Sequence, residues 1–104
     1  VKQGYTKCNT AIIDETSVIT SDKGIFKAAS PHLDVLLIRP GHIILKGFDY
    51  GFIGGACGRI GDEIIFNGDI SAHPDYDTIQ FFIKSRGLNI KYFDYPLEDI
   101  GSII

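Results

Sequence analysis

The chain has 104 residues, of which 44% are hydrophobic and 12% aromatic, and its formal net charge is -3. This length suits one domain, and this apolar content supports a packed core and excludes a disordered chain. The lysines and arginines are scattered singly, which argues against a nucleic-acid or anionic-membrane partner because those surfaces require clustered positive charge.

The cysteine content and the lengths of the apolar runs indicate the redox state and the location of the protein. Two cysteines, Cys8 and Cys57, are too few for a disulfide scaffold, and no CxxC pair or histidine–cysteine cluster predicts a metal site. No apolar run is long enough to span a bilayer and no signal-like segment opens the chain, so we expect a cytoplasmic protein with reduced thiols. The sequence lacks methionine, so we expect either a tag or a larger N-terminal portion to have been removed before Val1, and we favour the second.

The first half of the chain has the pattern of a hairpin, a helix and a further strand. Short apolar runs are separated by turn residues, and Asp22 is placed to cap the first turn of the helix with its carboxylate. The run after the helix is apolar and branched, which is typical of a strand buried on both faces. The predicted elements are strands over 10–14 and 17–20, a helix over 23–30, and strands over 34–38 and 42–45.

The second half repeats this plan. Its helix has Pro74 at the first position, Asp75 and Asp77 near the positive end of the helix dipole, and Gly87 as a left-handed cap. The predicted elements are strands over 57–60 and 63–66, a helix over 74–86 and a strand over 89–92, after which the segment 99–104 closes the chain with Ile100, Ile103 and Ile104.

The two halves also resemble each other in sequence. Ala11–Glu15 reads AIIDE and Arg59–Glu63 reads RIGDE, and each is followed by an apolar pair, a helix and a further strand. We therefore predict an α/β fold of the α+β type, a single unit over 1–104 built from two ββαβ modules, 1–46 and 47–104. Two stacked repeats leave their outer faces uncovered, so we expect missing N-terminal blades of the same protein, or a homo-oligomer, to cover them.

Five segments carry a family resemblance: Gln3–Asn9 (QGYTKCN), Val18–Asp22 (VITSD), Tyr50–Gly55 (YGFIGG), Phe66–Asp69 (FNGD) and Pro96–Ser102 (PLEDIGS). Together they resemble the C-terminal part of an uncharacterised bacterial family assigned to the fold of the guanidino-group-modifying enzymes. This pentein fold is a five-bladed α/β-propeller, so the resemblance implies that the chain is two blades of five. The family has no established activity, and a fold by itself does not specify one.

Cys57 is the first candidate for chemistry. It lies in the loop Gly54–Gly58 (GGACG), where glycines permit the close approach of a substrate to a thiolate. In pentein enzymes such as arginine deiminases the nucleophilic cysteine also follows a glycine-rich stretch, and the resemblance implies that role here. Those enzymes carry the cysteine near the chain end, whereas a whole ββαβ unit follows Cys57. The alternative is a small buried cysteine packed where glycines allow it.

Cys8 and Asn9 form the second candidate. In the alignment of the two halves Asn9 corresponds to Cys57, and Cys8 lies one place earlier. Equivalent positions of neighbouring blades lie near each other around a propeller axis, so these three residues are predicted to converge at one mouth. Convergence would give a ligand site, a redox pair or a cluster of packed small residues.

His73 and the aspartates of the two modules are the remaining polar candidates. His73 precedes a helix, where it either acts as an acid or base or occupies a cap position. Acidic side chains grip the guanidinium in pentein enzymes, and the resemblance implies that role, with a small cationic ligand, for Asp22 and Asp69. A helix cap suffices for Asp22 and explains Asp69 less well. His32 and His42 read as surface residues without partners.

Two functions follow from these observations. One is a binding or assembly module, for which the pentein fold offers a precedent in a ribosome anti-association factor without enzymatic role. The other is part of a guanidino-group-modifying hydrolase or transferase that uses Cys57 as nucleophile. No complete histidine, carboxylate and cysteine set is visible, which favours binding, and no cofactor is expected. The aromatic segment Phe48–Phe52 is either an exposed patch for a partner or packing between blades.

Overall fold

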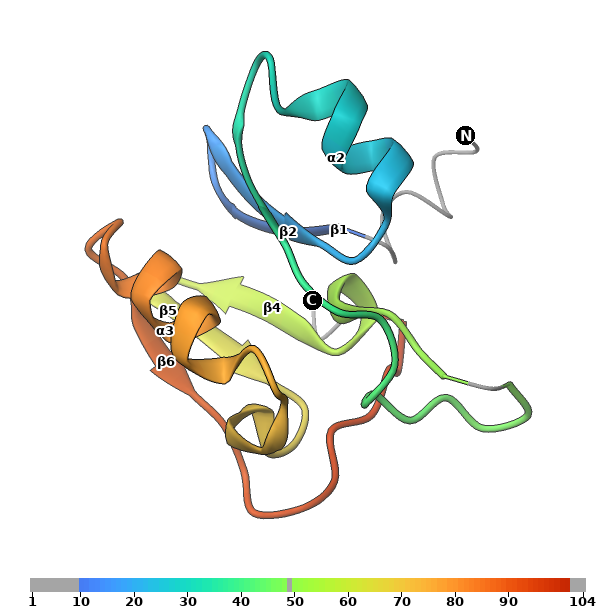
Figure 1. Cartoon of the computed structure of the whole chain (residues 1–104). Helices are drawn as coiled ribbons and strands as arrows, with labels where there is room; N and C mark the ends of the chain where they lie inside the picture. Colours follow the sequence, from blue (N-terminus) through green and yellow to red (C-terminus); the bar gives the residue numbers. More distant parts are fainter. Residues whose placement is uncertain (1–9, 49, 102–104) are drawn as a thin grey trace.

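The computed structural model describes residues 10–48 and 50–101, in two similar halves (Figure 1). Module 1 consists of β1 (Thr10–Asp14), β2 (Ser17–Thr20), α2 (Lys23–Ala29) and β3 (Asp34–Leu37). A 3-10 turn, η1 (Ile53–Gly55), leads into the second half. Module 2 consists of β4 (Cys57–Ile60), β5 (Glu63–Phe66), a second 3-10 turn η2 (Ile70–Ala72), α3 (Tyr76–Lys84) and β6 (Asn89–Lys91).

Each module contains one three-stranded sheet, and the two sheets have the same topology. Their strand orders are β1-β2-β3 and β4-β5-β6, with an antiparallel first pair and a parallel second pair. The registers correspond as well, because Ser17 pairs with Asp34 in the first sheet and Glu63 pairs with Asn89 in the second. The fold is therefore α+β, with two three-stranded sheets and two α-helices in the described part of the chain.

Capping and turn residues in the sequence predict the ends of both helices to within a few residues. The Asp22 carboxylate accepts hydrogen bonds from the amides of Gly24 (2.8 Å) and Ile25 (3.1 Å), which confirms the predicted cap of α2. Gly87 has a φ of 77°, as a left-handed cap requires. The prediction that Pro74 opens the second helix is wrong, because α3 begins at Tyr76.

Two strand predictions need correction. The strand over 34–38 is not buried on both faces, because β3 forms an edge of its sheet and has no fully buried residue. The central strand β2 is the one whose four residues are all buried. Segment 42–45 forms only an isolated bridge, between Ile44 and Glu98, and residues 99–101 form no strand. Residues 102–104 lie outside the described residues.

Successive strand residues point to opposite faces, so each sheet has two distinct faces. We call the face that carries the module's own helix its helix face and the other its back face. In module 1 the back face presents Ala11, Ile13 and Ile19, which belong to the main hydrophobic core. Val18 is buried but lies outside that core, on the side of α2. Figure 1 shows α2 and module 2 on opposite sides of this first sheet.

The main core lies between the two modules. It joins the back face of module 1 to the helix face of module 2, where Ile64 and Phe66 pack with Ile79 and Ile83 of α3. The segment that follows α3 also attaches to module 1, since Arg86 Nε donates to Ser17 Oγ at 2.8 Å. Helix α3 is thus held by both modules, whereas α2 contains no fully buried residue.

Candidate functional site

Cys57 is a core residue in this structure. Its side chain belongs to the hydrophobic core, and its thiol donates to the Ile53 carbonyl with a sulfur–oxygen distance of 3.3 Å. Burial raises the pKa of the Cys57 thiol to about 12, so the thiol is protonated near neutral pH. A nucleophile needs an accessible thiolate. The catalytic role of Cys57 stays a prediction, and these surroundings favour the packed-cysteine alternative.

The glycines before Cys57 make room for Asp99, a residue that sequence reasoning missed. A Cβ at Gly55 would lie 1.7 Å from Asp99 Oδ1, and one at Gly51 would lie 2.5 Å from Asp99 Cβ. The buried carboxylate accepts hydrogen bonds from the amides of Phe52 (3.0 Å) and Gly101 (2.9 Å). Close approach is therefore made by the protein's own aspartate, which occupies the space that we had assigned to a substrate.

Asp69 is a local cap. It precedes η2, and its Oδ1 accepts hydrogen bonds from the Ser71 amide (3.0 Å) and from the Ser71 hydroxyl. The expectation that a cap explains Asp69 poorly is therefore wrong, because an intervening 3-10 turn supplies the amides to be capped. Asp22 and Asp69 thus use their carboxylates in the same way, each at the end of the second strand of its module.

His73 is buried, with 4% of its surface exposed, at the end of η2. Its Nδ1 accepts a hydrogen bond from the Asp75 amide at 3.0 Å, whereas its Nε2 is buried without a partner among the described residues. Burial is the largest cause that lowers the pKa of His73 below its ordinary value, and the Asp75 carboxylate opposes it. This histidine therefore favours its neutral form and occupies a cap position rather than an accessible acid–base site.

His42 is the partner that the sequence did not reveal for His73. The two rings meet edge to face with centroids 5.5 Å apart, and His42 adopts a left-handed φ of 66°. The expectation that His42 is a surface residue without a partner is therefore only half right, because it is exposed but contacts His73. His32 is exposed, as expected. Cys8 and Asn9 lie outside the described residues, so their convergence with Cys57 stays a prediction.

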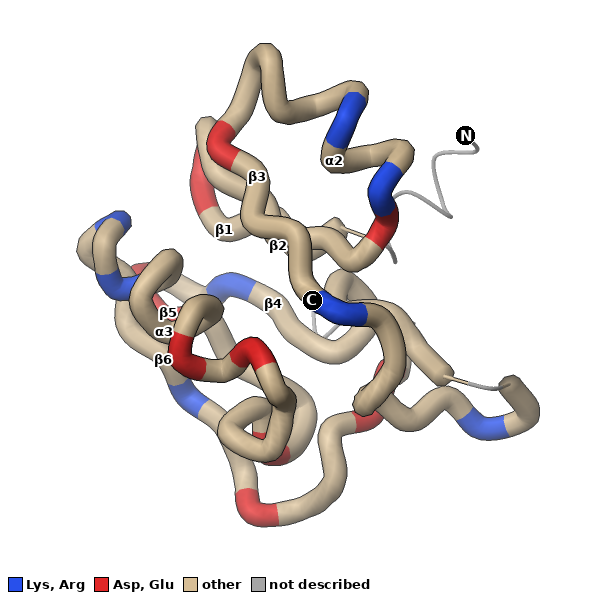
Figure 2. Tube along the Cα trace, viewed as in Figure 1, with Lys and Arg blue, Asp and Glu red and all other residues tan. Residues whose placement is uncertain are grey.

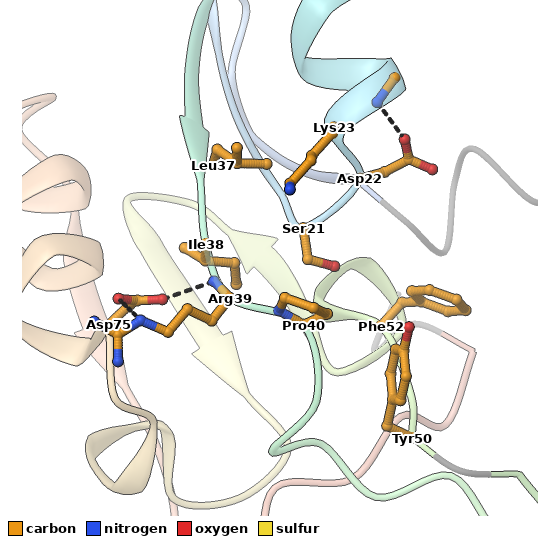
Figure 3. A pocket seen from close by; sticks show the side chains of 11 residues that line it. Ser21, Asp22, Lys23, Leu37, Ile38, Arg39, Pro40, Tyr50, Phe52 and Asp75 are labelled. Carbon is orange, nitrogen blue, oxygen red and sulfur yellow. Dashed lines mark hydrogen bonds and ion pairs between the residues drawn. The ribbon is translucent and has the colours of Figure 1, made fainter.

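One cavity in the described part of the chain lies between the modules and has a volume of about 790 Å³ (Figure 3). It forms where β2 and β3 end and α2 begins, and Asp75 reaches it from module 2. Cavities of this size commonly hold small molecules. Its lining consists of Ser21, Asp22, Lys23, Gly24, Leu37, Ile38, Arg39, Pro40, Tyr50, Phe52 and Asp75.

Asp75 ties the two modules together at this cavity. Its Oδ2 accepts a hydrogen bond from the Arg39 amide at 2.7 Å, and its Oδ1 lies 3.5 Å from Arg39 Nε. The prediction that Asp75 simply faces the dipole of its helix is incomplete, because its side chain makes no cap hydrogen bond and is used across the module boundary. The cavity thus has a polar wall held by contacts far apart in sequence.

The aromatic segment after Lys46 forms the opposite wall of the cavity. Tyr50 and Phe52 meet edge to face with ring centroids 5.8 Å apart, and both line the cavity. Phe48 is 72% exposed and is not part of that wall. The exposure of Phe48 favours the exposed-patch interpretation for this end of the segment, whereas Phe52 is half-buried.

The distribution of charged side chains and of possible metal ligands bears on what the described residues can bind. Figure 2 shows Lys and Arg separated along both modules, with Asp and Glu between them. The described residues contain no group of three or more His, Cys, Asp or Glu side chains that could hold a metal ion. Within the same residues, every helix is too short or too polar to cross a membrane.

Comparison with known proteins identifies a family. The chain belongs to a family of unknown function, DUF6873, whose sequence model matches residues 1–104. No curated protein and no solved structure matches the chain. The comparisons therefore establish membership of this family and assign no activity.

Proposed function

We propose that the two modules are consecutive blades of a pentein-like five-bladed α/β-propeller and that the chain serves as a binding and assembly module. The observation that carries this proposal is the unequal cover of equivalent surfaces. The back face of module 1 is buried in the core, whereas the equivalent back face of module 2 is partly exposed. The sequence resemblance to the pentein fold supports the same assignment.

The sheet registers identify the equivalent residues. Ala11 and Ile19 pair across the back face of module 1, and both are buried. Gly58 and Ile65 pair across the back face of module 2, where neither is fully buried. Ile60 extends this second surface and is 55% exposed. The same face also carries Glu63, Asn89 and Lys91, so module 2 exposes a mixed surface with Ile60 and Ile65 where module 1 buries its back face.

The helices show the complementary difference. Helix α3 is attached at both ends to module 1 and buries Ile79 and Ile83. Helix α2 has no corresponding neighbour among the described residues and buries no residue completely. The contact between the modules is heterologous, with the back face of one meeting the helix side of the next, and such contacts form a ring when the rotation from one module to the next closes. A further ββαβ module therefore fits both uncovered surfaces.

Two sources could supply that module: further blades of the same protein or additional copies of this chain. Both place the same kind of surface on the back face of module 2, so the proposal concerns the surface and the type of partner. The enzymatic alternative, a guanidino-modifying enzyme with Cys57 as nucleophile, ranks second because the thiol is buried and protonated. The aspartates expected to grip a cationic ligand also serve as caps.

Sedimentation velocity of the 104-residue chain over a wide concentration range tests the proposal. We expect reversible association through the exposed module surfaces. Ile60→Glu places a charge on the back face of module 2, so we expect at least about tenfold weaker association, the loss of one buried isoleucine. Phe81→Glu is the matched control, since Phe81 is 75% exposed on α3, a helix that already has its neighbour.

The outcomes separate cleanly. Association that is weakened by Ile60→Glu and unaffected by Phe81→Glu supports the proposed surface. Equal weakening by both variants would indicate non-specific apolar association and would contradict it. A strictly monomeric chain at every concentration would also overturn the assembly role, because the exposed faces would then need no cover.

A further inference from the structure

We propose that the cavity between the modules binds a small planar molecule that carries one anionic group, such as an aromatic carboxylate. The proposal depends on which charged groups at the cavity are already used and which are not. It concerns a different surface from the one proposed for assembly, so either proposal can fail without the other.

The two carboxylates that line the cavity are already used by the fold. The Asp22 carboxylate accepts hydrogen bonds from the amides of Gly24 and Ile25, and Figure 3 shows its side chain turned toward the start of α2. The Asp75 carboxylate accepts a hydrogen bond from the Arg39 amide and also lies beside the Arg39 guanidinium. A cationic ligand would have to compete with these contacts, so the cavity offers it little.

Two donors at the cavity, on Lys23 and Ser21, are not used in this way. Among the described residues, Lys23 Nζ has no ion pair and Ser21 Oγ has no hydrogen bond. Figure 3 shows the Lys23 amine extending toward Ser21 and Leu37, on the cavity side of α2. An ammonium and a hydroxyl that are both available can together bind a carboxylate through charge-assisted hydrogen bonds.

The apolar lining determines the shape of the rest of the ligand. The rings of Tyr50 and Phe52 and the ring of Pro40 form one wall, and Leu37 and Ile38 add aliphatic surface. Aromatic rings in such a wall favour planar groups, which they contact by stacking or edge to face. The volume of about 790 Å³ accommodates a bicyclic ring with space for ordered water.

Three probes of nearly equal shape test the charge preference: 2-naphthoate, 2-naphthamide and 2-naphthamidine. Binding is measured on the full chain by titration of the backbone amide ¹H–¹⁵N spectrum. We expect 2-naphthoate to shift the amides of residues 21–24 and 37–39, and to bind about tenfold more tightly than the amide, as one charge-assisted hydrogen bond predicts.

A matched pair of variants then assigns the preference to one side chain. Lys23→Gln should abolish the tenfold preference for 2-naphthoate over 2-naphthamide. Lys27→Gln should retain it, since Lys27 lies one turn further along α2 and does not line the cavity. Three results would each overturn the proposal. 2-Naphthamidine could bind most tightly of the three probes, the amide shifts could be centred outside residues 21–24 and 37–39, or Lys23→Gln could leave the preference unchanged.

Discussion

Replacing Gly55 with alanine tests the packing of Asp99 in the glycine loop. The new Cβ would lie 1.7 Å from Asp99 Oδ1, so the carboxylate would have to move. Movement breaks the hydrogen bonds from the Phe52 and Gly101 amides. Each hydrogen bond to a charged group contributes about 1.5 to 3 kcal/mol, so we expect Gly55→Ala to lower the free energy of unfolding by roughly 3 kcal/mol or more. A domain of this size has only about 5 to 15 kcal/mol in total.

Urea denaturation of a double-mutant cycle distinguishes this clash from other effects. Asp99→Ala removes the carboxylate atoms that collide with the new methyl group, so Gly55→Ala should be nearly harmless in that background. Gly51→Ala is the control, because its Cβ would lie 2.5 Å from Asp99 Cβ, which alanine retains. We expect it to stay destabilising in both backgrounds. Equal destabilisation by Gly55→Ala with and without the Asp99 carboxylate would refute the reasoning.

Two further predictions concern Cys57 and His73. In a Cys8→Ser background, a haloacetamidine should label Cys57 about a thousandfold more slowly than a thiol of pKa 9.0, because burial raises the pKa of Cys57 to about 12. The labelling rate of the folded chain is measured by mass spectrometry. A rate equal to that of an ordinary thiol would contradict this prediction. The pKa of His73 is lowered in the folded chain, so the stability associated with the neutral imidazole is fully present above its ordinary pKa of 6.5. This stability is lost as the pH falls from 6.5 through the lower pKa of the folded chain. Urea unfolding from pH 8 to pH 5 should show wild type losing more stability than His73→Gln, with His32→Gln behaving like wild type; parallel curves for wild type and His73→Gln would count against it.

Most of the local structure can be predicted from neighbouring residues in the sequence. The strands over 57–60 and 63–66 were predicted with the bounds that β4 and β5 have, because short branched runs flank a turn at Gly61. The cap at Asp22 was also predictable, since its donors lie two and three residues away. The similar ββαβ order of the two halves was visible for the same reason, because every signal involved neighbouring residues.

The contacts of the site residues depend on the tertiary structure. The Asp99 carboxylate meets Gly55 across 44 residues of chain, and Asp75 meets the Arg39 amide across 36. No local pattern marks such contacts, because they depend on how the two modules pack. Packing also buried Cys57, as the packed-cysteine alternative predicts, and left β3 without a fully buried residue, against expectation. Propensity and capping act within a few residues, whereas burial and charge pairing are set by which surfaces meet in the folded chain.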